Sequence, residues 1–245
     1  MNTRTAAAIA VIAAAAVLAQ CGGSKPEATP APSPTTRTAT TTKHRHKKVA
    51  PRKAPDPPVP HALFAKGLDL RAGPVPIPLE LLIPSINVRA QMLGVGVTST
   101  DVMDAPEGRV GDPVWQEAFW YRGSAIPGVI STALIAGHIN GPRGTSAVFA
   151  NIDKLRPGDQ IIVHDTRSAL DVRFAVTGST SFTLAQTTQP DVLRQIYGVG
   201  PVAGTTPQRS KDGLAHLTLV TCAGDFNTGL GTHDHRLAVF ATRVS

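Results

Sequence analysis

From Ile77 onward the sequence consists of short apolar runs separated by Gly, Pro and Asp. Apolar and β-branched runs bounded by such turn-forming residues are typical of β-strands. The pattern predicts strands over residues 80–83, 90–97, 132–137, 160–164, 172–177, 216–221 and 236–244. Residues 165–171 are predicted to form the turn that joins two of these strands.

Helical periodicity is scarce in the same region. Residues 147–155 are predicted to form one or two helical turns. A second short helix is expected over residues 191–198, because Pro190 suits a helix start. A sheet closed into a barrel, with a few short helices in its connections, accounts for this pattern and gives an all-β fold. Gly94 and Gly96 lack the third glycine and the following helix of a dinucleotide-binding loop.

The N-terminus has a different character. Arg4 precedes an uncharged, alanine-rich run over residues 6–19, which is shorter than the ~20 residues of a membrane span and fits a secretory signal. The run ends at Leu18-Ala19-Gln20-Cys21, which resembles a bacterial lipoprotein signal, although the family normally has a smaller residue than Gln20 before the cysteine. The resemblance implies a signal over residues 1–20 and lipidation of Cys21. The alternative is an uncleaved anchor with an incidental cysteine.

Residues 21–60 are predicted to be a disordered basic linker. Nine prolines lie between residues 24 and 60, together with the basic cluster 43–48, and there is no apolar period. Such a chain is extended and cannot form a core. His44 and His46 make at best a weak metal site on such a chain. An irregular lead-in over 61–76, which includes His61, and a catalytic domain over 77–245 complete the predicted organisation.

The charge distribution narrows the function. The formal charge is +7, but residues 24–60 carry a surplus of six positive charges and Arg4 supplies the seventh. Residues 61–245 contain fifteen basic and fifteen acidic side chains. A neutral domain is not expected to bind nucleic acid. The chain has two cysteines, which excludes a disulfide scaffold and a four-thiolate zinc site.

Three residues at the ends of predicted strands suggest nucleophilic chemistry. Cys222 ends the run over 216–221, His138 follows the run over 132–137, and Arg236 opens the last strand. Taken singly, these are a buried inert cysteine, a loop histidine and a solvated arginine. Together they provide a thiol, a base that accepts its proton, and a permanent cation for a developing oxyanion.

These residues carry a resemblance to the sortases. Residues 217–222 (Leu-Thr-Leu-Val-Thr-Cys) resemble the T-L-x-T-C signature of that family, and Ala136-Gly137-His138 resembles its histidine motif. Arg236 stands 14 residues after the cysteine, as in the arginine strand that closes the sortase domain. Residues 120–128 are similar to class E and class F members from actinobacteria, although Ala223 replaces a glycine that many of those relatives have.

The resemblance implies an eight-stranded β-barrel and a cysteine transpeptidase. By the matched motifs, Cys222 is the nucleophile, His138 the general acid and base, and Arg236 the residue that stabilises the oxyanion or positions substrate. Thr221 is expected to contact substrate. No acidic cluster matches the calcium site of some class A members, so neither a metal nor a cofactor is predicted.

The implied reaction cleaves an LPxTG-like sorting signal between Thr and Gly through a thioacyl-enzyme. The acyl group then passes to an amine of a cell-wall precursor. The implied partners are exported proteins bearing sorting signals, that precursor, and the outer face of the cytoplasmic membrane through the N-terminus. The protein is expected to be a monomer.

Three alternatives remain at this point. One is a thiol peptidase or amidase that only hydrolyses, and another is a cell-surface lipoprotein with a sortase-like fold and no turnover. The third is a metal site at His233 and His235 beside Asp234, for which no further ligand is evident. His164 and His216 are interpreted as ordinary strand residues.

Overall fold

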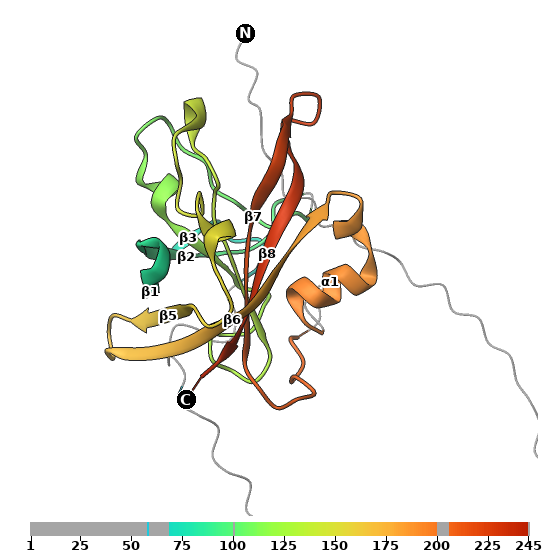
Figure 1. Cartoon of the computed structure of the whole chain (residues 1–245). Helices are drawn as coiled ribbons and strands as arrows, with labels where there is room; N and C mark the ends of the chain where they lie inside the picture. The colour runs from blue at the N-terminus through green and yellow to red at the C-terminus, as the bar shows by residue number, and fades with distance from the viewer. Residues whose placement is uncertain (1–57, 59–68, 100, 200–205, 245) are drawn as a thin grey trace, which may run out of the picture. The chain divides into compact units, whose positions relative to one another are not determined.

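The computed structural model describes residues 58, 69–99, 101–199 and 206–244. The predicted signal segment, Cys21, the histidines at 44, 46 and 61, and the linker other than Pro58 lie outside these residues. The described chain forms a closed barrel in the strand order β1-β2-β3-β4-β7-β8-β6-β5 (Figure 1). The predicted all-β, eight-stranded barrel is confirmed.

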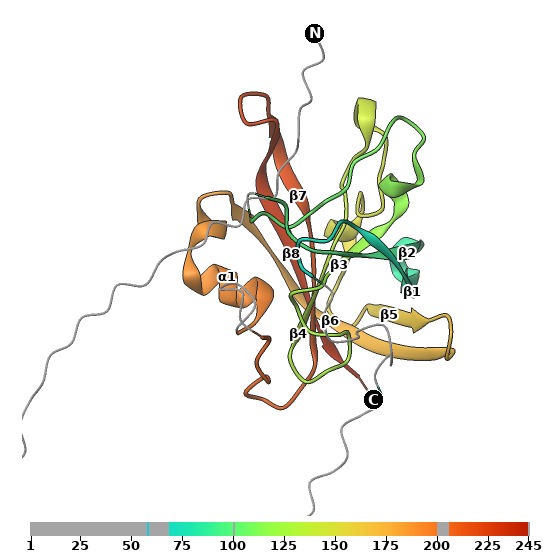
Figure 2. The same ribbon diagram turned by 180° about the vertical axis from the view of Figure 1, so that it is seen from behind.

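The strands are β1 (Val75–Ile83), β2 (Val88–Val95), β3 (Ala118–Tyr121), β4 (Thr132–Ala136), β5 (Gln160–Asp165), β6 (Leu170–Thr183), β7 (His216–Asn227) and β8 (Thr232–Arg243). One α-helix, α1 (Pro190–Tyr197), agrees with the predicted helix start at Pro190. Figures 1 and 2 show α1 on the opposite side of the barrel from β5 and the β1–β2 hairpin. In both views the β7–β8 hairpin and the loops after β2 and β4 project from the same end.

Strand β3 has no counterpart among the predicted strands. All four of its residues are buried, so the segment shows no alternation of apolar and polar positions and is short for a strand. It pairs in parallel with β2 and antiparallel with β4. β3 therefore closes the wall between two strands that the sequence predicts separately.

Of the one or two helical turns predicted over residues 147–155, the structure has one, the 3-10 turn η4 (Ile152–Lys154), and the start of the segment is not helical. The backbone N–H groups of Ala147, Val148 and Phe149 donate to the carbonyls of Ile139, Trp115 and His138, respectively. These donors hold three segments together and are not used in an α-helix.

Strand ends also differ from the predicted limits. β1 begins at Val75, inside the predicted irregular lead-in, and its prolines sit near a register shift between Ile77 and Glu80. Because proline lacks the N–H that donates in a β-ladder, a proline-containing segment is not predicted as a strand from its sequence. β7 continues past Cys222 to Asn227, with a register shift between Ala223 and Phe226.

Two apolar clusters lie on opposite faces of the barrel wall. All eight strands contribute to the first, which therefore fills the interior and includes Ile135, Phe174, Leu219 and Val239. The second lies on the outer face, where Leu134, Ala136, Val220 and Ala238 pack with the buried side of α1. Because successive strand residues point to opposite faces, β4, β7 and β8 are buried on both sides.

Candidate active site

Cys222 and Arg236 face each other across the β7–β8 pair. They are register partners in this antiparallel ladder. Val220 and Ala238, two residues away on each strand, belong to the outer cluster. By alternation, the thiol and the guanidinium lie on the same outer face. Cys222 is a free cysteine and is partly exposed.

His138 reaches the same level from the other side of Cys222. β4 and β7 run in parallel, and the last paired residues are Ala136 and Val220. The Gly137 N–H donates to the Val220 carbonyl at 3.1 Å, which keeps the two chains together beyond the ladder. Extended by two residues, this register brings the backbone of His138 level with Cys222. By register, the three predicted residues therefore fall in one row across the end of β4, β7 and β8.

Arg236 is not at the start of a strand, as the sequence suggested, but is the fifth residue of β8. It pairs with Cys222 on one side and Phe182 of β6 on the other, and it is only 2% exposed. Its Nη1 donates to the carbonyls of His233 (2.9 Å) and His235 (2.8 Å), and its Nη2 donates to Thr232 Oγ1 at 3.0 Å. The guanidinium is thus held in place by uncharged oxygens.

The His138 ring lies in an apolar setting with one polar contact. Trp115 packs on it at a centroid distance of 4.7 Å and Phe119 approaches edge-on at 5.3 Å. Nε2 lies 3.0 Å from the Pro106 carbonyl. Burial lowers the pKa of His138, and the Pro106 contact and the Glu107 charge oppose this only in part. A carbonyl can only accept, so Nε2 carries the proton and Nδ1 is left as the basic nitrogen.

Thr221 lies on the interior side of the row. Its side chain is 1% exposed, and its Oγ1 donates to the Gly137 carbonyl at 2.8 Å. This bond ties β7 to the residue before His138. The residue as a whole is 1% exposed, so in this structure Thr221 is a buried tie between β7 and the end of β4.

Comparison with known proteins agrees with the motifs. The family model described as the sortase domain matches residues 81–244, about two-thirds of the chain. This protein belongs to the sortase family.

Several solved sortase structures are similar to it. Sortase A from Corynebacterium diphtheriae is 20% identical over 71% of this chain and 63% of that one, with a TM-score of 0.47. Sortase C-1 from Actinomyces oris is 20% identical over 70% and 76%, with a TM-score of 0.45. The chain thus spans less than two-thirds of the C. diphtheriae protein. No curated protein has a matching sequence.

The histidines near the arginine do not form a shared site in this sortase. His233 and His235 are strand residues, since β8 begins at Thr232. His233 Nδ1 contacts the Gly224 carbonyl at 2.9 Å, whereas His235 Nδ1 contacts Asp234 at 2.7 Å. Among the described residues, no group of three or more His, Cys, Asp or Glu could hold a metal ion.

The other two histidines behave as strand residues. His164 in β5 contacts Asp171 at 2.8 Å, and His216 in β7 contacts Asp212 at 2.9 Å. No helix among the described residues has the length and apolar character needed to cross a membrane.

Two parts of the site carry no signal in the sequence. Trp115 and Pro106 both contact His138, yet they lie 23 and 32 residues before it in a loop region. No spacing rule links a loop tryptophan or a proline carbonyl to a distant histidine. Only the folded β2–β3 connection brings them to the ring.

Proposed function

We propose that this sortase is a cysteine transpeptidase that cleaves an LPxTG-like sorting signal between Thr and Gly and transfers the protein to an amine of a cell-wall precursor. The observation that supports it is the row formed by Arg236 on β8, Cys222 on β7 and His138 just after β4. The row combines a thiol on a partly exposed residue, a ring that can exchange a proton, and a fixed cation.

In the first step the Cys222 sulfur attacks the threonine carbonyl. Nδ1 of His138 takes the thiol proton, and the negative charge that develops on the carbonyl oxygen is stabilised by Arg236. Collapse breaks the Thr–Gly bond, and His138 returns the proton to the leaving glycine amine. The product is a thioester between threonine and Cys222.

In the second step an amine attacks the thioester. His138 takes a proton from the amine, the C–S bond breaks, and the proton passes to the departing Cys222 sulfur. Water competes for the same thioester and gives hydrolysis. Transfer therefore requires that the amine is positioned next to His138.

We propose that the N-terminal segment places this reaction at the outer face of the cytoplasmic membrane, through lipidated Cys21 or an uncleaved anchor. Cys21→Ser distinguishes these two arrangements. Loss of metabolic lipid labelling and of membrane retention supports lipidation, and retention without labelling supports the anchor.

The proposed chemistry is tested by mass spectrometry of the intact protein with a small library of sorting peptides. An adduct on Cys222 that is released as a new amide when an amine is added is the expected result. Cys222→Ala is expected to form no adduct at position 222 and no product, because it removes the proposed nucleophile. Turnover by that variant would refute the assignment, and only hydrolysis at high amine concentration would favour a peptidase.

A further inference from the structure

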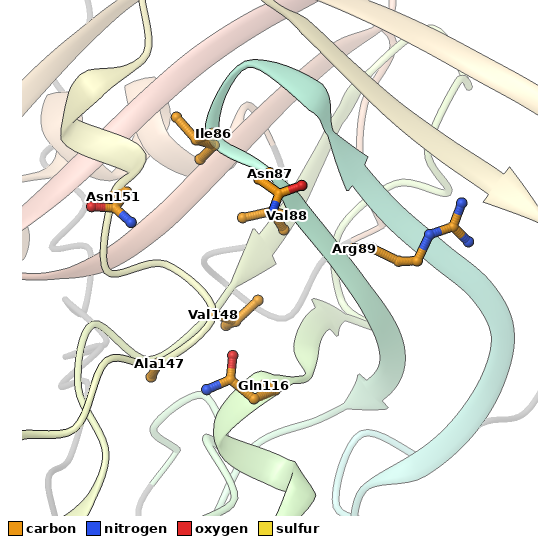
Figure 3. Close-up of a pocket in the computed structure, with 8 residues that line it drawn as sticks. All are labelled: Ile86, Asn87, Val88, Arg89, Gln116, Ala147, Val148 and Asn151. Atoms are coloured by element: carbon orange, nitrogen blue, oxygen red, sulfur yellow. The ribbon is translucent and has the colours of Figure 1, made fainter.

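A pocket of about 360 Å³ lies between the β1–β2 turn, the segment before β3 and the loop after β4. Its lining residues are Ile86, Asn87, Val88, Arg89, Gln116, Ala147, Val148 and Asn151. Figure 3 shows Val148, Gln116 and Asn151 facing the start of β2 across this space. None of the three predicted catalytic residues lines it.

One wall of the pocket is an open strand edge. β2 pairs with β1 from Val88 to Gly94, but it pairs with β3 only from Met92 onward. In an antiparallel pair, alternate residues direct their N–H and C=O groups away from the partner strand. Two of the residues 88–91 therefore present backbone donors and acceptors on the side where no described strand pairs with them.

The polar groups around this edge suit a peptide. Asn87, Gln116 and Asn151 contribute carboxamides, and a carboxamide offers the same donor and acceptor pair as a peptide group. Gln116 Nε2 donates to the Ser146 carbonyl at 2.9 Å, which fixes that side chain at the pocket wall. Ile86, Val88 and Val148 add apolar surface for small side chains.

The charge of the pocket points to an uncharged ligand segment. Arg89 is its one charged lining residue, and its Nη1 lies 2.6 Å from Glu80 Oε2. The same carboxylate accepts from Gln91 Nε2 at 2.6 Å. This lining offers no uncompensated cation to a phosphate or an anionic headgroup, whereas it matches the neutral backbone of an extended peptide.

The pocket is connected to His138 through two short segments. Gln116 follows Trp115, whose ring packs on the histidine. Val148 donates its N–H to the Trp115 carbonyl, and Phe149 donates to the His138 carbonyl. Arg236 lies on the other side of Cys222, so the pocket is on the histidine side of the thiol. An amine that gives its proton to His138 would approach from this side.

We propose that this pocket binds the peptide portion of the amine acceptor, added as an extended segment to the open edge of β2, with its amine directed past Trp115 to His138. That the amine goes to His138 rests on the proposed function. That a peptide binds to the open edge of β2 does not. Acceptors with a peptide arm then have an advantage over small amines and water at the thioester.

Partitioning of the thioacyl-enzyme tests the proposal. The probes are the pentapeptide amides of glycine and of alanine, an N-acetylated alanine pentapeptide amide with a central lysine, and hydroxylamine, which is too small to span the pocket. At least one pentapeptide is expected to half-saturate transfer well below the hydroxylamine concentration. Gln116→Ala and Asn151→Ala are each expected to raise the peptide concentration that half-saturates transfer about tenfold. This is the effect of losing one hydrogen bond.

Hydroxylamine transfer and the rate of thioacyl formation are expected to stay unchanged in both variants. Gln195→Ala, an exposed carboxamide on α1, is the matched control. The proposal is overturned if no pentapeptide outperforms hydroxylamine, if the variants leave the peptide response unchanged, or if both nucleophiles weaken equally.

Binding of the same peptides to Cys222→Ala, measured by calorimetry, needs no thioester and separates the two proposals. Binding that Gln116→Ala weakens supports the pocket even if no thioacyl-enzyme ever forms. Absence of binding to Cys222→Ala by every pentapeptide overturns the pocket while leaving the thiol chemistry intact.

Discussion

The environment of His138 decides which of its protonation states is present at neutral pH. Trp115 and Phe119 exclude water from the ring, and burial is the largest influence on its pKa. A charged imidazolium is disfavoured in such surroundings. The Pro106 carbonyl accepts from Nε2 and fixes the tautomer, which leaves Nδ1 as the basic nitrogen. The ring is thus prepared to accept a proton.

We expect activity to fall on acidification with a midpoint below 6.5, the ordinary pKa of histidine. In the proposed mechanism the neutral ring is the base, and a lowered pKa keeps it neutral to lower pH. Trp115→Ala exposes the ring and is expected to move the acid limb of kcat/KM upward, towards 6.5. A profile measured from pH 4 to 9 checks this, and an unmoved limb would show that Trp115 does not influence the titration.

Arg236→Lys is expected to lower turnover by about 10²–10³-fold. A lysine keeps the charge but cannot reproduce the planar set of contacts to His233, His235 and Thr232. Single-turnover measurement of thioacyl formation is the direct assay. Circular dichroism and the melting temperature serve as controls, because a variant that unfolds would indicate a structural role for this buried side chain instead.

At the scale of elements, the site depends on how β7 is tied to its two neighbours. The β7–β8 ladder sets Cys222 against Arg236, and beyond it Gly224 adopts a positive φ of 74°. L side chains rarely adopt this conformation, and a Cβ at this position would also press against the Asp234 side chain. Glycine therefore lets the hairpin bend after the cysteine without backbone strain. On the other side, Thr221 ties β7 to the end of β4.

Thr221→Val tests that second connection. The change keeps the shape but removes the bond to the Gly137 carbonyl, so we expect a loss of about 1–2 kcal/mol in the free energy of unfolding. Turnover is expected to fall about tenfold, since His138 is no longer held level with Cys222. Thr218→Val, at a second buried threonine of β7 four residues before Cys222, is the control and should spare turnover.

At the scale of the whole molecule, stability and site geometry depend on different clusters. The interior cluster closes the barrel, whereas the outer cluster supports the face that carries Cys222. A change in the first should alter how much protein is folded. A change in the second should alter what the folded protein can do.

Phe174→Ala, in the interior, is expected to lower the free energy of unfolding by about 3–5 kcal/mol. Leu193→Ala, on the buried side of α1, is expected to cost about 2–3 kcal/mol. Urea denaturation measures both. Activity per folded molecule should be retained in the first variant and reduced in the second, and the reverse order would contradict this division.

Much of this organisation is accessible from the sequence, for reasons that differ by element. The apolar runs of β4, β5 and β7 and the start of α1 at Pro190 are local patterns, and they predict those elements closely. β3 and the 147–149 segment are set by partners far along the chain, which no local pattern records. Cys222, His138 and Arg236 are found through their motifs, whereas Trp115 and Pro106 come to the ring only through folding.

The pairing of β4 with β7 has a consequence for biosynthesis. The thiol and the imidazole are 84 residues apart in the chain. They come together only when β7, the penultimate strand, pairs in parallel with β4, which is synthesised much earlier. Contacts of such long sequence separation form slowly. In a nascent or partly folded chain, the Cys222 thiol would therefore lack the histidine beside it. Recovery of activity after dilution from denaturant would report the last stage of barrel closure.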